Sequence, residues 1–94
     1  LKQLKKLNLR GNDLTPRSLE LLATSKHVTG LKSLNLEVTG TNDEGVEFLI
    51  SSENLGNLEE LNLGFNQIGP EALRALLKTR NFPKLKALTL TNIR

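Results

Sequence analysis

Leucines recur along this chain at a constant interval of 27 residues, and this repeat constrains the fold more than any other feature. The first column comprises Leu4, Leu31, Leu58 and Leu85, and two further columns, which begin at Leu7 and Leu9, keep the same spacing without a gap. The surrounding segments read LKKLNLRGN, LKSLNLEVT, LEELNLGFN and LKALTLTNI. Four copies in phase indicate a chain built from repeating units.

Each unit divides into a short strand, a turn, a helix and a return segment. The motif leucines alternate with polar residues, as in a strand with one buried face. Leu19, Leu22 and Ala23 have the i, i+3, i+4 spacing of an apolar helix stripe, and apolar residues recur at these positions in the next two units. Proline in a first helical turn or an N-cap residue marks the helix starts, at Thr15-Pro16, Asn42 and Gly69-Pro70.

Two columns follow each predicted helix. The first comprises His27, Asn54 and Asn81, where we expect left-handed helix caps. The second comprises Val28, Leu55 and Phe82, which we expect to turn inward before the next strand. Near the helix starts, small residues form a column of Ser18, Gly45 and Ala72, which predicts a close approach of helix and sheet.

With these elements in place, the chain resembles the leucine-rich-repeat family over essentially its whole length. The first and third copies match L-x-x-L-x-L-x-x-N in full, and the others lose only the last position. Units such as NQIGPEALRALLKTRNFPKLKALTL are similar to the 27-residue repeats common in bacterial proteins, close to the ribonuclease-inhibitor-like type. The resemblance implies an α/β fold, a right-handed solenoid with parallel strands on the concave face and helices on the convex face. It also implies binding of other macromolecules.

We predict a single segment over residues 1–94, with repeats at about 4–30, 31–57 and 58–84 and a partial repeat at 85–94. One unit cannot bury its own leucines, so stability comes mainly from contacts between neighbouring units. The chain lacks methionine, starts at an inward position, Leu1, and stops at Arg94 before a fourth helix. We therefore expect further repeats or caps in a longer protein, and self-association through the uncapped ends.

The resemblance also assigns a role to Asn12 and Asn66. In the family, the side chain at this position bonds backbone groups in the turns of neighbouring units. Thr39 and Ile93 occupy the position in the other two copies and break the column. Because the second unit also carries a polar residue, Thr41, where its neighbours are apolar, we predict that the turn over residues 39–42 is the least regular.

The net charge of +3 conceals a segregation of charge along the sequence. Residues 33–73 carry eight acidic residues and no Lys or Arg, whereas both flanking stretches are mainly basic. Adjacent strands lie about 4.8 Å apart, so residues one repeat apart become neighbours. We therefore predict the charge ladders Lys32–Glu59–Lys86 and Lys26–Glu53–Arg80 and the pairs Glu47–Arg74 and Arg17–Glu44. Such exposed pairs contribute about 0–1 kcal/mol each and chiefly disfavour slipped registers.

No group of side chains meets the requirements of catalysis, and we predict neither an enzyme nor a cofactor. Nucleophilic catalysis needs a nucleophile and a base in contact, but the chain has no cysteine and its one histidine, His27, falls in a turn. Asp43, Glu44 and Glu47 gather at a helix start, where acids favour the helix dipole. They lack histidine partners, and GTNDEG does not fit a calcium loop. The absence of cysteine is compatible with a reducing compartment such as the cytoplasm.

Nucleic acid and membrane are also excluded as predicted partners. The basic residues Lys2, Lys5, Lys6 and Arg10 lack stacking aromatic neighbours, and the following unit is acidic rather than a continuation of one basic stripe. No apolar run approaches the roughly 18 residues of a membrane span. A protein partner is the remaining expectation.

We predict that this partner binds the concave face, because strand alternation directs every second residue outward. The candidate residues are Lys6, Asn8, Arg10, Ser33, Asn35, Glu37, Val38, Glu60, Asn62 and Phe65. The asparagine column either hydrogen-bonds a partner's backbone or stays hydrated. Phe65 is either an exposed binding hot spot or packs against neighbouring turns. Two alternatives stay open: a structural spacer between flanking domains, and repeats that select substrates for an enzyme domain outside this segment.

Overall fold

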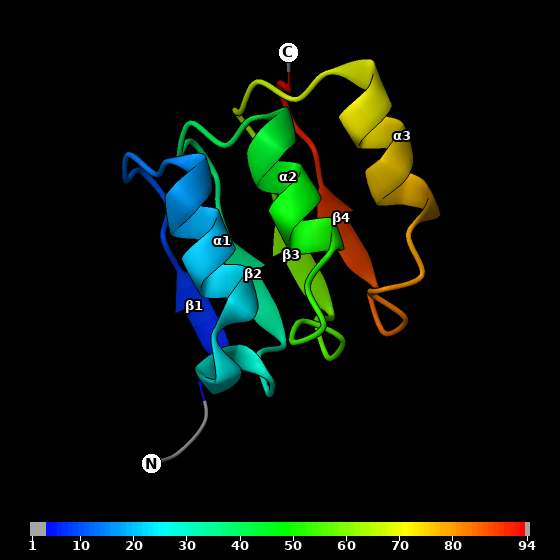
Figure 1. The fold of residues 1–94 in the computed structure, drawn as a ribbon. Helices are drawn as coiled ribbons and strands as arrows, with labels where there is room; N and C mark the ends of the chain where they lie inside the picture. The colour runs from blue at the N-terminus through cyan, green and yellow to red at the C-terminus, as the bar shows by residue number, and fades with distance from the viewer. Residues whose placement is uncertain (1–3, 94) are drawn as a thin grey trace.

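Strands and helices alternate along the chain, and the strands form one parallel sheet (Figure 1). The structure, a computed structural model, describes residues 4–93, so the expectations for Leu1, Lys2 and Arg94 lie outside the described residues. The strands are β1 (Lys6–Asn8), β2 (Ser33–Asn35), β3 (Glu60–Asn62) and β4 (Ala87–Thr89). The helices are α1 (Pro16–Thr24), a 3-10 helix η1 (Lys26–Val28), α2 (Asp43–Ile50) and α3 (Pro70–Lys78). The predicted α/β class is confirmed.

The sheet confirms the predicted register of one repeat between adjacent strands. Its order is β1-β2-β3-β4, with Leu7 beside Leu34, Leu34 beside Leu61 and Leu61 beside Leu88. Pairing continues past the short strands, because Leu36 N–H donates to the Asn62 carbonyl at 2.8 Å. Equivalent bonds join the other strand pairs. Parallel pairing of sequence neighbours is the arrangement expected of a solenoid.

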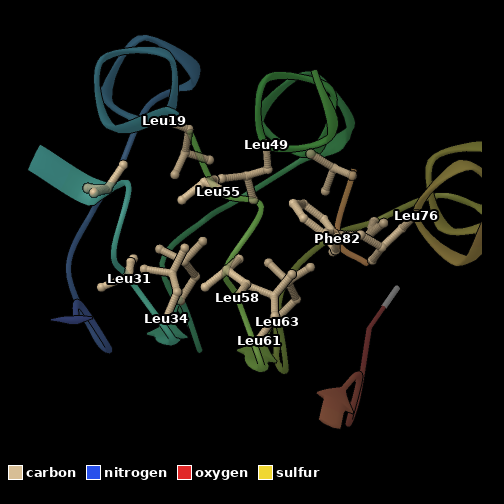
Figure 2. Close-up of a cluster of buried hydrophobic side chains, with 14 of the residues drawn as sticks. Leu19, Leu31, Leu34, Leu49, Leu55, Leu58, Leu61, Leu63, Leu76 and Phe82 are labelled. Atoms are coloured by element: carbon tan, nitrogen blue, oxygen red, sulfur yellow. The ribbon is translucent and has the colours of Figure 1, made fainter. Parts of the chain in front are cut away.

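The core lies between the sheet and the helices, and leucine fills most of it (Figure 2). The inward leucines of β2 and β3 and of the residues around them are at most 1% exposed. Leu19, Leu49 and Leu76 of the helices pack against these leucines, and Leu55 and Phe82 of the return segments belong to the same cluster (Figure 2). The predicted inward column of Val28, Leu55 and Phe82 is therefore confirmed. The leucines of the inner units are the most fully buried, because each inner unit has a neighbour on both sides.

The predicted helix starts are also confirmed. Thr15 and Ser18 form a capping box at α1, and the Asn42 side chain accepts the Gly45 N–H at 3.1 Å at α2. Helix α3 starts at Pro70 after Gly69, whose N–H donates instead to Asp43 of the preceding unit at 2.7 Å. Each of these hydrogen bonds satisfies an N–H group that lacks a partner within the helix at its N-terminal end.

The expected left-handed caps at His27, Asn54 and Asn81 are wrong. None of the three has a positive φ, and His27 belongs to the 3-10 helix. Their N–H groups donate instead to the hydroxyls of Ser25, Ser52 and Thr79, two residues earlier.

The side chains of Asn54 and Asn81 connect neighbouring units at the same place. The Asn54 amide donates to the Ala23 carbonyl at 3.4 Å, and the Asn81 amide donates to the Ile50 carbonyl. Ser52 Oγ also donates to Ala23 at 2.5 Å. These bonds satisfy carbonyls at the C-terminal end of the preceding helix, which lack partners inside the helix.

The close approach at Gly45 involves two helices rather than a helix and the sheet. A Cβ atom at Gly45 would overlap Leu19 Cδ1 of α1 and lie 3.3 Å from Thr41 Cγ2. The expectation of a helix–sheet contact was wrong, because the first turn of α2 faces the buried stripe of α1. In the same column, Ser18 serves the capping box of its own helix.

The structure also corrects the interpretation of the Asn12–Asn66 column. Asn66 bridges two units: its Oδ1 accepts N–H groups of Thr39 and Thr41, and its Nδ2 donates to the Leu36 carbonyl. Thr39 breaks this bridging column as predicted, because its hydroxyl bonds Leu36 and Thr41 of its own unit. The expected bridge from Asn12 was wrong, since its amide donates to Leu9 of its own unit at 2.9 Å. The turn after Thr39 also differs at Gly40, which has a φ of +74°. The predicted irregularity of residues 39–42 in amide exchange remains a prediction.

Most of the predicted charge ladders do not form. Within residues 4–93, Glu59 pairs with Lys86 at 3.9 Å, whereas Arg17 pairs with Glu20 of its own helix at 2.8 Å rather than with Glu44. Lys26–Glu53–Arg80, Glu47–Arg74 and Lys32–Glu59 make no ion pair among these residues. Helices pack about 8–10 Å apart and strands about 4.8 Å apart, so residues one repeat apart are farther from each other on the helix side, as for Glu47–Arg74. This spacing does not explain Lys32–Glu59, whose backbones are joined by a 2.8 Å hydrogen bond.

Candidate protein-binding surface

Four of the predicted binding residues line one shallow groove on the exposed face of the sheet. Strand alternation places Ser33 and Asn35 on β2 beside Glu60 and Asn62 on β3, in the register that the repeat predicts. Ala87 and Thr89 of β4 complete the groove, which has a volume of about 230 Å³. The structure therefore brings together residues that are separated by a full repeat in the sequence.

In each asparagine of the column on this face, the side-chain oxygen forms a hydrogen bond within the chain. The Oδ1 atoms of Asn8, Asn35 and Asn62 each accept the backbone N–H two residues later, at 3.0, 2.9 and 2.9 Å. No Nδ2 atom of the three donates to a protein acceptor within residues 4–93. Because the Oδ1 bonds fix the orientation of each amide, the Nδ2 donors remain directed outward. These donors are oriented for a partner or for water.

One charged pair of the predicted surface is used internally. Arg10 Nε donates to Glu37 Oε1 at 2.5 Å, just past the ends of β1 and β2, so the two charges partly compensate each other. Lys6 and Glu60 are exposed and make no ion pair in the described part of the chain. Lys6 and Asn8 lie on β1 and Arg10 follows it, all outside the groove over β2–β4, so the predicted set does not form one continuous site.

The exits of the strands carry a second, more apolar groove. Val38 and Phe65 are 45% and 49% exposed, and they line a groove of about 370 Å³ with Asn66, Gln67 and Asn92. Phe65 therefore presents about half of its surface to solvent instead of folding fully against the neighbouring turns. The set of predicted residues omitted Asn66, Gln67 and Asn92, although Asn92 lies one repeat after Phe65 in the same column.

The backbone at this second groove is left-handed in every unit. Gly11, Val38, Phe65 and Asn92, one repeat apart, have φ values of +79°, +49°, +57° and +51°. The repeat could have indicated this shared conformation, because Gly and Asn occupy two of the four positions. The sequence interpretation missed it.

The acidic residues at the start of α2 form no metal site. In the described residues, no group of three His, Cys, Asp or Glu side chains is arranged to hold a metal ion. Asp43, Glu44 and Glu47 line a groove on the helix side with Glu71, and the Asp43 carboxylate accepts the Gly69 N–H. Over residues 4–93, no helix is long and apolar enough to cross a membrane.

Comparison with known proteins identifies the repeat. A family model described as "Leucine Rich repeat" matches residues 2–23 and 57–77. No curated protein matches the chain. The matched segments include the first and third copies of the motif, which are the two that retain asparagine at the last motif position. The chain therefore carries leucine-rich repeats of the ribonuclease-inhibitor type at two positions, within a segment of four parallel strands that alternate with helices.

Proposed function

We propose that this chain is a protein-interaction module that binds a macromolecular partner on its concave β-face, and that it has no catalytic activity of its own. All four copies of the motif act as repeats of one solenoid of the 27-residue bacterial type. Leucine-rich repeats are generally protein-interaction modules, which supports the broad class. Fold alone does not supply a partner.

One observation carries the proposal. Ser33, Asn35, Glu60 and Asn62, from two strands, line a single open groove together with β4. The backbone beneath them is fixed by the parallel pairing on both sides of β3. A rigid surface loses little conformational entropy when it binds, so more of the contact energy contributes to affinity.

Affinity capture with the whole chain, followed by a titration with the captured protein, tests the proposal. The concave variant carries Glu60→Arg and Ala87→Arg, two exposed positions in one column of the sheet. The matched convex variant carries Glu47→Arg and Ala75→Arg, two exposed positions beside the groove between α2 and α3. Both variants change the net charge by the same amount, so a difference between them reports position.

We expect the concave variant to bind at least tenfold more weakly and the convex variant to bind like the parent chain. Equal loss in both variants would indicate a nonspecific charge effect. Loss in the convex variant alone would assign binding to the helices. Circular dichroism melts of all three proteins should first establish that each is folded.

The structural-spacer function has one observation in its favour. The asparagine Oδ1 atoms and the Arg10–Glu37 pair bond within the chain, so much of the polar concave surface is already used. A spacer tolerates both charge-reversal variants. Unchanged function of the full protein with the concave variant would therefore support the spacer.

A further inference from the structure

At three of the four strand exits, the left-handed residue forms a hydrogen bond with the next unit. The N–H of Gly11 donates to the Glu37 carbonyl at 3.1 Å, the N–H of Val38 to Gly64 at 3.0 Å, and the N–H of Phe65 to Thr91 at 2.7 Å. Each bond joins one unit to the next and extends the parallel pairing past the strand. Bonds between units therefore accompany the left-handed conformation at these three positions, and Asn92 adopts the same conformation with no such bond among the described residues.

Val38 and Phe65 are poor residues for this conformation. The left-handed region is open to glycine and tolerated by asparagine, and Gly11 and Asn92 occupy the equivalent positions of this chain. A β-branched or bulky side chain is uncommon there because its Cβ approaches the following carbonyl oxygen. Val38 and Phe65 remain nearly half exposed, so burial within the chain does not offset the strain. Strained residues of this kind concentrate at binding surfaces.

The groove that these two side chains line has no charged residue. Its other lining residues are Asn66, Gln67 and Asn92, all neutral. Its volume of about 370 Å³ falls at the lower end of the range for ligand sites. An uncharged, apolar group of limited size, such as an aliphatic side chain, is therefore complementary to it.

A negative charge lies at the opposite end of the same strand. Glu60 starts β3, five residues before Phe65, and a strand rises about 3.3 Å per residue, so the two lie at most about 16–17 Å apart. Residues 33–73 contain no Lys or Arg, and the nearby Lys86 reaches Glu59 instead. Within residues 4–93, Glu60 therefore lacks a cation.

We propose that the partner presents an extended segment to β3, with an aliphatic side chain in the Val38–Phe65 groove and a lysine or arginine at Glu60. This inference rests on the proposed concave-face function and specifies the chemistry of the partner. Valine and phenylalanine occupy these strained positions, in place of glycine or asparagine, because their side chains contact that partner. Charge complementarity sets the direction in which the segment lies.

Defined peptides test the chemistry directly. The whole chain, labelled with ¹⁵N, is titrated to millimolar concentration with acetyl-Leu-Thr-Ser-Thr-Arg-amide, whose Leu and Arg lie on one face of an extended peptide about 13 Å apart. Two control peptides replace Leu by Ser or Arg by Glu. We expect amide shifts at Val38, Phe65 and Glu60 with the first peptide, and at least threefold weaker binding of each control.

Two protein variants test the residues. Phe65→Asn should weaken peptide binding at least threefold and raise the urea midpoint, because asparagine suits the left-handed backbone, as at position 92. Glu60→Gln should weaken binding of the Arg peptide and leave the Glu peptide unchanged or bound more tightly. The matched controls are Leu21→Asn, an exposed leucine on α1, and Glu47→Gln, an exposed acid on α2. Both controls should bind like the parent chain.

Several outcomes would overturn the inference. These are the absence of shifts at any concentration, shifts elsewhere on the surface, equal binding of the three peptides, and a lower urea midpoint in Phe65→Asn, which would make Phe65 a packing residue. The outcome for the proposed concave-face function can be distinguished from the outcome for this inference. If the Glu60→Arg and Ala87→Arg variant loses a captured partner that Phe65→Asn still binds, the function stands and the inference about the groove fails.

Discussion

Removal of the Asn66 side chain should destabilise this chain more than any equivalent change in the same column. Asn66 is 3% exposed, and its amide forms hydrogen bonds with two units at once. Its Oδ1 accepts the N–H groups of Thr39 and Thr41, both at 3.1 Å. Its Nδ2 donates to carbonyls of Leu36, Leu63 and Gly64 at 2.9, 3.0 and 3.2 Å.

The magnitude follows from the groups that would lose their only partner. In Asn66→Ala, the Leu36 carbonyl keeps the Thr39 hydroxyl, and the Gly64 carbonyl keeps the Val38 N–H. The N–H groups of Thr39 and Thr41 and the carbonyl of Leu63 keep no described protein partner. Each buried unsatisfied group costs about 1–3 kcal/mol, and water entering the cavity relieves part of the sum, so we expect a loss of about 3–5 kcal/mol. The total free energy of unfolding of a domain of this size is about 5–14 kcal/mol.

Asn12→Ala provides the matched control. Asn12 occupies the same column but is exposed, and its side chain donates one hydrogen bond, to Leu9 at 2.9 Å. Solvent can replace that bond, so the expected loss is below about 1 kcal/mol. Urea unfolding followed by circular dichroism at 222 nm gives both free energies of unfolding. A difference between the two variants of less than about 1 kcal/mol would refute the assignment of a bridging role to Asn66.

Three further predictions concern contacts between neighbouring units. Gly45→Ala should lower the free energy of unfolding by about 1–3 kcal/mol in the same urea assay, because the overlap of its Cβ with Leu19 outweighs the helix preference of alanine. The control Gly56→Ala adds a Cβ in open space and should change this free energy by less than about 0.5 kcal/mol. Ser52→Ala should cost about 1–2 kcal/mol in thermal unfolding, because its buried hydroxyl bonds two backbone groups; no change would contradict the bridge between helix ends. Arg10→Ala should cost less than about 1 kcal/mol, since its side chain is 61% exposed; a loss of 2 kcal/mol or more would show that solvent does not screen the pair with Glu37.

The repeat in the sequence determined the fold and the positions of most outward residues. A leucine every 27 residues fixes which strands are neighbours, because units of equal length stack in register. Alternation within each strand then places Ser33 and Asn35 beside Glu60 and Asn62, in the groove that the structure shows. Local signals sufficed for the helix starts as well, since a cap bonds N–H groups within three residues of itself.

Only the tertiary structure decided how neighbouring units contact each other away from the sheet. The packing of Gly45 against Leu19 and the bonds from Asn54 to Ala23 depend on the spacing and orientation of two helices, which the repeat length does not specify. The charge ladders failed on the helix side for the same reason, because residues one repeat apart lie farther from each other there than on the strands. The left-handed backbone at Val38 and Phe65 likewise occurs where each N–H bonds the next unit, against the preference of both residues.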